Sequence, residues 1–279
     1  MYKIIGDSGT EVNESFIKNF PISIVPFKLY LDNIEYTDNE CLNINDFVTK
    51  MKKTTSIPRT ACPSPHDFLN LFVGEENELY IVTVSSKLSG AYNSAILAKN
   101  LYEEENPNKK LIHVFDSLSA ATGQTLIVKK IHELKNLHYA FDQIISIITE
   151  YILSTRVIFI SESLNNLISN GRISAWKGLI ASTLNIVPIM GSDGYGQIKL
   201  LERTRGTNKA YSRLTEIIQS ELTLSERNTV AIAHVDNSYR ANQLESEILK
   251  LLDTKTVISL ECAGLSSLYA DYKGIIVAF

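Results

Sequence analysis

The sequence contains little cysteine, no excess of basic charge and no long apolar run. Its 279 residues include three cysteines, one tryptophan and 27 basic against 31 acidic residues, a formal net charge of −4. Cys41, Cys62 and Cys262 are scattered without metal-ligand spacing, which argues against a disulfide scaffold or a metal centre and favours a reducing compartment. The acidic balance argues against a nucleic-acid-binding surface. The longest apolar-leaning segment, residues 144–152, is too short to span a bilayer.

The composition is otherwise that of an ordinary globular protein with a sizeable core. Hydrophobic residues make up 44% of the chain and charged residues 21%, which is typical of soluble domains. The apolar start of the chain is interrupted by Asp7, so no signal peptide is predicted. We therefore expect a cytoplasmic protein without stable membrane insertion.

A strand, a hydroxyl-rich turn and a helix follow one another in the most informative stretch. Residues 79–84 have the length and β-branched content of a buried strand, and apolar residues recur at helical spacing from Ala95 onward. Ser85, Ser86 and Ser89 lie between them, with Ser89 as the predicted N-cap. Such a helix start can bind a carboxylate. Two interpretations stay open, namely a simple cap and an anion site.

The order of elements predicts an α/β fold with two α/β domains. The first, residues 1–154, is expected to contain mainly a parallel sheet with helices. The second, residues 155–279, is expected to contain a mixed sheet with helices. Predicted strands and helices are given by residue number: strands 3–6, 22–27, 27–31, 34–36, 79–84, 110–115, 157–160, 186–190, 197–201, 229–235, 257–260 and 274–279; helices 11–20, 43–54, 66–72, 124–134, 140–153, 163–169, 175–184, 208–222 and 238–252.

Three predicted strands end in similar polar turns, at Asp7-Ser8, Ser85-Ser86 and Asp116-Ser117. The carboxyl ends of parallel strands line one crevice in an open α/β sheet, and ligands bind there. The turns therefore predict a binding site at one edge of the first sheet.

One alternative function is a GDSL-like ester hydrolase with Ser8 as its nucleophile. Residues 6–9 read Gly-Asp-Ser-Gly directly after the first strand, as in those esterases. Their base comes from a late Asp-x-x-His, and no histidine here has an aspartate three residues before it. A serine without a base is not activated, so this interpretation is the weaker one.

Several motifs, in order and along nearly the whole chain, carry a family resemblance. They include residues 7–10 (Asp-Ser-Gly-Thr), 60–65 (Thr-Ala-Cys-Pro-Ser-Pro), 85–92 with Ser-Gly-Ala-Tyr, 116–117 (Asp-Ser), 170–174 (Asn-Gly-Arg-Ile-Ser) and Arg205 with 209–210 (Lys-Ala). Together they resemble the DegV family of bacterial fatty-acid-binding proteins, which includes the lipid-binding subunits of fatty acid kinases.

The resemblance implies a carrier protein that binds one long-chain fatty acid in a buried tunnel of the first domain. It places the carboxylate at the domain interface, held by Thr60 and by Ser89 with Gly90 in the same turn; Ser117 belongs to the third turn. Arg172 and Arg205 would border the head group or face a partner kinase. It implies no catalysis by this chain alone, no cofactor and no metal.

Some positions depart from the family pattern. Ala61 and Cys62 replace Ser-Gln, and Ala91 replaces the Thr after Ser-Gly. Residues 262–266 read Cys-Ala-Gly-Leu-Ser where kinase-linked members carry His before Gly-Pro-Gly. The Cys262 position weakens the expectation of a fatty acid kinase partner more than that of lipid binding. Acyl chain length, unsaturation and oligomeric state are not encoded in recognisable motifs.

Overall fold

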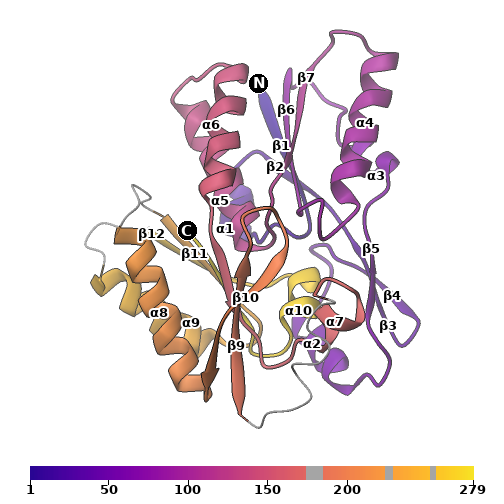
Figure 1. The fold of residues 1–279 in the computed structure, drawn as a ribbon. Coiled ribbons are helices and arrows are strands. Elements are labelled where there is room, and N and C mark those ends of the chain that lie inside the picture. Colours follow the sequence, from indigo (N-terminus) through magenta and orange to yellow (C-terminus); the bar gives the residue numbers. More distant parts are fainter. Residues whose placement is uncertain (174–184, 224–228, 252–255) are drawn as a thin grey trace.

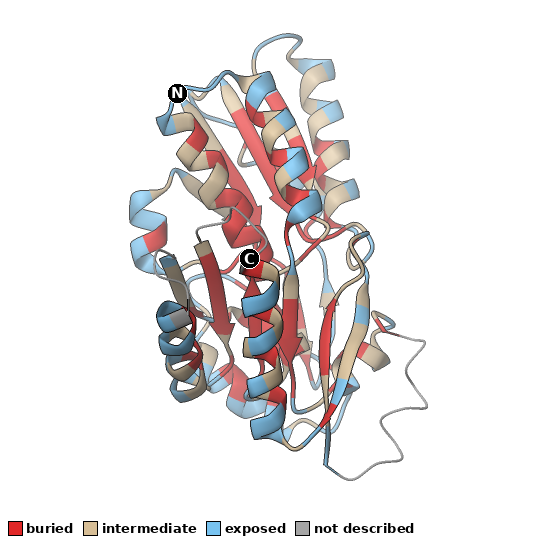
Figure 2. Ribbon diagram, turned by 60° about the vertical axis from the view of Figure 1, so that its left-hand side comes forward, coloured by how far each residue is buried: buried red, intermediate tan, exposed pale blue. Residues whose placement is uncertain are grey.

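The structure is a computed structural model that describes residues 1–173, 185–223, 229–251 and 256–279. The chain folds into two α/β halves, one above the other in Figure 1, with a small third sheet beside the lower half. Figure 2 shows buried residues along the strands of both large sheets and exposed residues on the outer faces of the helices. The predicted fold class is therefore confirmed.

The first half is built on four parallel strands in the order β2-β1-β6-β7. These are β1 (Tyr2–Asp7), β2 (Ile22–Val25), β6 (Glu78–Thr83) and β7 (Leu111–Asp116). Successive side chains of a strand point to opposite faces of the sheet, and in these strands both sets of positions are largely apolar. Both faces of the sheet are therefore covered by helices. Helices α3 (Pro65–Leu69) and α4 (Ala91–Glu105) cover one face, and α1 (Glu14–Asn19), α5 (Thr122–Asn136) and α6 (Phe141–Ser154) cover the other.

A three-stranded antiparallel sheet interrupts the first half in sequence. It has the order β4-β3-β5 and consists of β3 (Lys28–Leu31), β4 (Ile34–Thr37) and β5 (Arg59–Ala61), with α2 (Ile44–Lys53) inserted before β5. Asp32 and Asn33 form the tight turn between the strands predicted at 27–31 and 34–36, with φ values of 48° and 66°, as such a turn requires. Its apolar face packs on α10 (Gly264–Ala270) from the far end of the chain.

The second half contains six strands in the order β10-β9-β8-β13-β11-β12. They are β8 (Val157–Ile160), β9 (Ile186–Ser192), β10 (Ile198–Arg205), β11 (Thr229–His234), β12 (Thr256–Glu261) and β13 (Ile275–Ala278). Only β11 and β12 pair in parallel, so this sheet is mixed as expected. Helices α8 (Thr207–Thr223) and α9 (Ser238–Leu251) pack on one face, while α7 (Asn165–Ser169) lies by the other with α10.

Local details differ from the sequence-based expectation at the α2 cap, at β5 and at α10. Asn45 is a possible cap of the predicted helix at 43–54, but helix α2 is capped by Asn43, whose side chain accepts from the Asp46 amide, and Asn45 lies inside the helix. Strand β5 and helix α10 were not predicted, because both are short and lack strong local signals. The predicted helix at 175–184 falls outside the described residues.

The predicted N-cap role of Ser89 is wrong. Helix α4 begins at Ala91, and Gly90 is its N-cap residue without a side-chain bond. The Leu88 and Ser89 amides both donate to the Ser85 carbonyl, which closes a separate turn first and shifts the helix start by one residue. Ser89 Oγ instead accepts from the Ala91 amide at 3.2 Å.

Candidate functional site

A mainly apolar cavity lies where the two halves meet. It encloses about 890 Å³ of space not filled by protein atoms, part of it open to solvent. The first half contributes turn residues such as Val84, Leu88 and Leu118, and the second contributes strand and helix residues such as Phe159 and Ile198. An apolar cavity with a few polar groups is the usual form of a small-molecule site.

The three polar turns predicted from the sequence do meet at one edge of the first sheet, where they bind each other. The Asp7 carboxylate accepts hydrogen bonds from the Val84 amide at 2.7 Å, the Gly9 amide at 3.0 Å and Gln124 Nε2 at 3.0 Å. Burial raises the pKa of Asp7 to about 6. Asp116 Oδ1 accepts from the Ser86 amide at 3.0 Å. The two aspartates therefore fix the turns that form the cavity wall.

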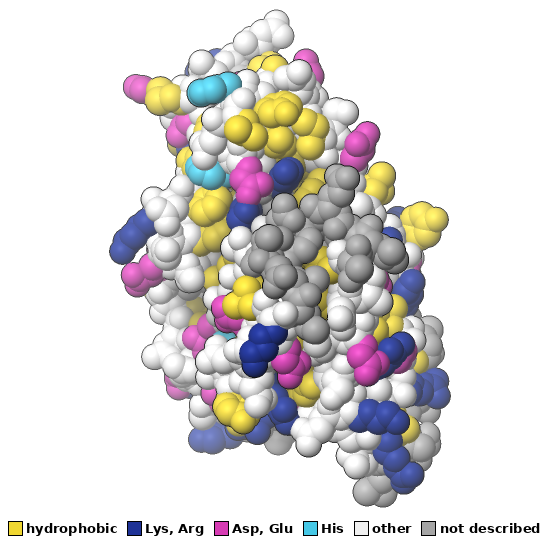
Figure 3. Space-filling view, turned by 90° about the vertical axis from the view of Figure 1, so that its left-hand side faces the viewer, with side chains coloured by type: hydrophobic (Ala, Val, Ile, Leu, Met, Phe, Trp, Pro, Cys, Tyr) yellow, Lys and Arg dark blue, Asp and Glu magenta, His cyan; other side chains and the backbone are white. Residues whose placement is uncertain are grey.

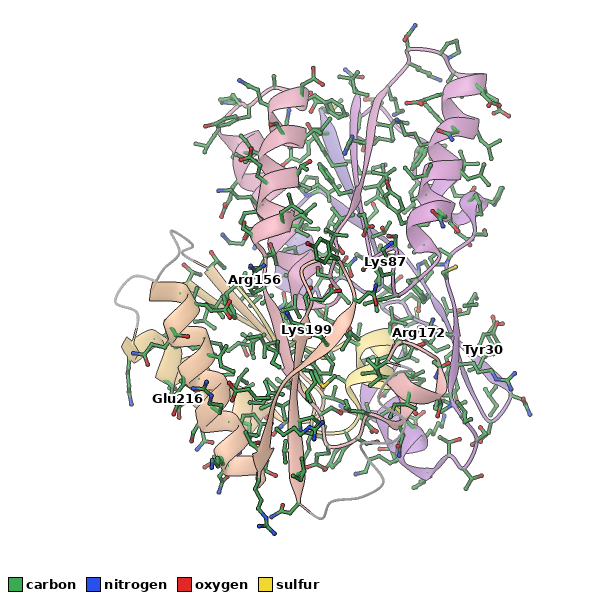
Figure 4. All side chains as sticks on the ribbon, in the orientation of Figure 1. Tyr30, Lys87, Arg156, Arg172, Lys199 and Glu216 are labelled. Carbon is green, nitrogen blue, oxygen red and sulfur yellow. The ribbon has the colours of Figure 1, made fainter. Side chains whose placement is uncertain are left out.

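Three predicted site residues, Thr60, Ser89 and Arg172, line this one cavity. Thr60 Oγ1 and Tyr269 Oη are 2.9 Å apart, and the Arg172 guanidinium lies 5.3 Å from the centre of the Tyr269 ring. Arg172 Nε also donates to the Leu88 carbonyl at 3.2 Å, directly before Ser89. The structure thus gathers hydroxyl groups and one guanidinium at the junction of the halves. Figure 4 shows Lys87 and Arg172 in this central region.

The other three predicted site residues do not line the cavity. Gly90 lies close to Cys62, whose Sγ would be 3.1 Å from a Cβ placed at residue 90. Ser117 is buried and donates to the Ser119 carbonyl at 3.1 Å. Arg205 is exposed at the end of β10 that pairs with Ile186, whereas Ile198, at the other end of that strand, lines the cavity.

Helix α10 supplies cavity residues that sequence reasoning missed. Leu265, Ser266, Tyr269 and Ala270 all line the cavity. The helix has no side-chain cap of its own at Ala263. Its first amides are bound instead by acids from the first half: Asp38 accepts from Gly264 at 2.8 Å and Leu265 at 2.9 Å. A cap from more than 200 residues away leaves no local sequence signal.

Asp38→Asn is expected to lower the free energy of unfolding by about 2 kcal/mol, because the amide group can no longer accept from both α10 amides. Urea denaturation of both proteins at pH 7 measures this change. Asp46→Asn, at an exposed position on α2, is the matched control and should change stability by less than about 0.5 kcal/mol. Equal destabilisation by the two substitutions would contradict the capping role.

The Ser8 hydroxyl forms hydrogen bonds within the fold. It accepts from the Phe27 amide at 3.0 Å and also lies against the Asp38 carboxylate. Neither partner is a histidine, so these contacts do not include the histidine base that the GDSL esterases use to activate their serine. The environment of Ser8 therefore gives no support to the esterase alternative.

Other kinds of site find little support in the described part of the chain. It holds no group of three or more His, Cys, Asp or Glu side chains arranged to bind a metal ion. Within the same residues, no helix combines the length and apolarity needed to cross a membrane. On the face in Figure 3, basic and acidic side chains are interspersed among uncharged ones.

Comparison with known proteins agrees with this architecture. The profile of the DegV family, described as "Uncharacterised protein, DegV family", matches residues 1–272. A DegV domain-containing protein of Streptococcus pyogenes serotype M18 is 34% identical over 280 residues, covering 100% of this chain and 99% of that protein.

Two similar solved structures were described with bound fatty acids. A DegV family protein from Ruminococcus gnavus with vaccenic acid superposes with a TM-score of 0.94 at 33% identity. The fatty acid kinase (Fak) B3 protein of Streptococcus pneumoniae, loaded with linoleic acid, superposes with a TM-score of 0.88 at 30% identity. Each comparison covers 100% of this chain and 99% of the other. With a family match along nearly its whole length, this chain belongs to the DegV family.

Proposed function

We propose that this protein binds one long-chain fatty acid in the cavity between its halves, with the acyl chain against the apolar wall. The carboxylate lies at the group formed by Thr60, Ser89 and Arg172. The observation that carries the proposal is that these three residues, far apart in sequence, line one apolar cavity. The fatty acids described in the similar R. gnavus and S. pneumoniae structures support the ligand class.

The energetics of the cavity fit an acyl ligand. Burying about 15 methylene groups at roughly 0.8 kcal/mol each gives a gross driving force on the order of 12 kcal/mol before ordering costs. Hydrogen bonds to a charged oxygen contribute roughly 1.5–3 kcal/mol each. Hydroxyl groups with one guanidinium are therefore sufficient to position the carboxylate. On this proposal the protein is a carrier and catalyses no reaction by itself.

We further propose that the protein presents the bound fatty acid to a fatty acid kinase. This proposal is supported by the similar S. pneumoniae protein, which is described as a fatty acid kinase component. Cys262 is buried in a core cluster to which both halves contribute. To test this part separately, a bacterial fatty acid kinase subunit is given the fatty acid bound to this protein, and phosphorylation of the acid is measured. Free fatty acid is the control.

Mass spectrometry of the purified protein tests the ligand class directly. We expect a stoichiometric mass excess in the native spectrum that disappears on denaturation and is identified by extraction as a fatty acid. A protein that carries no lipid and takes up no offered fatty acid would overturn the proposal.

Ser89→Ala is expected to weaken fatty acid binding by about 1–3 kcal/mol, because the carboxylate loses one hydrogen-bond donor. Direct titration with a radiolabelled fatty acid measures the change. Ser94→Ala, one turn into the same helix, is the matched control and should bind normally. Unchanged affinity in Ser89→Ala would rule out the proposed position of the head group.

A further inference from the structure

Tyr269 lies between two of the proposed head-group residues. Its hydroxyl oxygen is 2.9 Å from Thr60 Oγ1, and the Arg172 guanidinium lies 5.3 Å from the centre of its ring. All three side chains line the cavity and are partly buried. Thr60 belongs to β5 and Arg172 to the segment after α7. The tyrosine therefore joins two residues that no local segment connects.

The Arg172 guanidinium is held by three uncharged groups. Its Nε donates to the Leu88 carbonyl at 3.2 Å and its Nη1 to the Asn170 carbonyl at 2.7 Å. The third group is the Tyr269 ring. Among the described residues, no carboxylate lies within ion-pair distance of Arg172. A guanidinium held on an aromatic ring, without an acid beside it, keeps its charge for an anionic ligand.

Helix α10, which carries Tyr269, is fixed at both ends by other segments. At its start, Glu11 Oε2 accepts from the Ala263 amide at 2.7 Å, in addition to the bonds from the aspartate described above. At its end, Ser161 Oγ donates to the Ala270 carbonyl at 2.6 Å. The tyrosine ring also packs against two core clusters. It is therefore a rigid support for the groups that it contacts.

We propose that Tyr269 is a positioning residue that makes the head-group site select a carboxylate over an uncharged head group on the same acyl chain. This inference rests on the proposed function. The ring holds the Arg172 guanidinium beside the ligand, and the phenol restrains the Thr60 hydroxyl through their hydrogen bond. A carboxylate gains from both groups, because its charge strengthens each hydrogen bond. A fatty alcohol meets the same groups without a charge and gains much less.

The ratio of two affinities, measured on the same protein, tests the inference. Radiolabelled vaccenic acid and the alcohol with the same acyl chain are titrated at pH 8 into the full-length chain stripped of lipid. The acid is ionised there, since carboxylic acids in water titrate near about pH 4. Damage to the fold or to the apolar wall weakens both ligands alike, so only a change at the head group alters the ratio of the two Kd values.

Two substitutions separate the ring from the hydroxyl. Tyr269→Leu removes both and should lower the preference for the acid about 30-fold. Tyr269→Phe keeps the ring beside Arg172 and should lower it only about threefold. The matched control is Tyr211→Leu, because Tyr211 lies 5.1 Å from the Arg240 guanidinium and accepts from Asn237 at 3.2 Å but is outside the cavity. This control should leave the preference unchanged.

A double variant tests whether the tyrosine acts through the arginine. Arg172→Gln alone should lower the preference for the acid about 100-fold. Adding Tyr269→Leu should lower it further by no more than about threefold, because two residues that act on one contact are not additive.

Three results would overturn the inference: an unaltered protein that binds the alcohol as tightly as the acid, a Tyr269→Leu variant that keeps the full preference, or losses that simply multiply in the double variant. Should Tyr269→Leu fail to fold by circular dichroism, the ratio for Tyr269→Phe, compared with that for Tyr211→Phe, decides. An unaltered protein that binds neither ligand would instead refute the proposed function, and this inference with it.

Discussion

The free energy of unfolding of this protein is expected to fall by up to about 1.4 kcal/mol for each pH unit between roughly pH 5 and 8, through Glu11 alone. Burial raises the pKa of this carboxyl from 4.5 to about 8. The folded chain therefore keeps a proton that the unfolded chain releases. The stabilisation is complete below the unfolded pKa of 4.5 and is lost as the pH rises through about 8.

Urea denaturation at pH 5.5, 7.0 and 8.5 measures this slope. In Glu11→Gln the slope should be reduced by about 1 kcal/mol per pH unit, because the amide cannot ionise. That variant should be more stable than the unaltered protein at pH 8.5. Glu261→Gln, at an exposed position, should follow the unaltered protein. Parallel stability curves for Glu11→Gln and the unaltered chain would show that Glu11 is ionised in the folded state.

Ile198→Trp is expected to weaken fatty acid binding by about 100-fold, equivalent to about 2.7 kcal/mol. Ile198 lines the cavity, is partly buried and packs against the core cluster beside it, so an indole group at this position would extend into the empty space. The acyl chain and the ring then compete for the same volume. Titration with vaccenic acid, together with a thermal melt, separates loss of binding from loss of fold.

The matched control for this substitution is Ile186→Trp. Ile186 is 37% exposed and lies on β9, opposite Arg205 and outside the cavity. We expect normal binding and a similar melting temperature. If Ile198→Trp bound vaccenic acid as tightly as this control, the acyl chain would have to lie elsewhere in the molecule.

Much of the fold follows from short-range patterns. The β-branched run at residues 79–84 and the apolar segments around it specify buried parallel strands, because only a strand covered on both faces is apolar throughout. Asp32 and Asn33 determine a tight hairpin by their tolerance of positive φ. Ser64 before Pro65 determines the start of α3, and its side chain is indeed bonded to the Asp67 amide.

The sequence by itself also indicated residues that the fold brings together. Three polar turns after parallel strands must share one sheet edge, and the ordered motifs indicated Thr60, Ser89 and Arg172, which the fold brings to one cavity. These signals are readable because each depends on residues a few positions apart.

Only the tertiary structure decided the role of α10 and its buried acids. Asp38 and Glu11 bind amides at the start of this helix from positions 226 and 252 residues away in sequence. No periodicity or cap motif records such contacts, and a buried glutamate looks like any other glutamate until its surroundings are assembled. Its proton is held because the fold removes it from water and from every cation among the described residues, a condition set by packing alone.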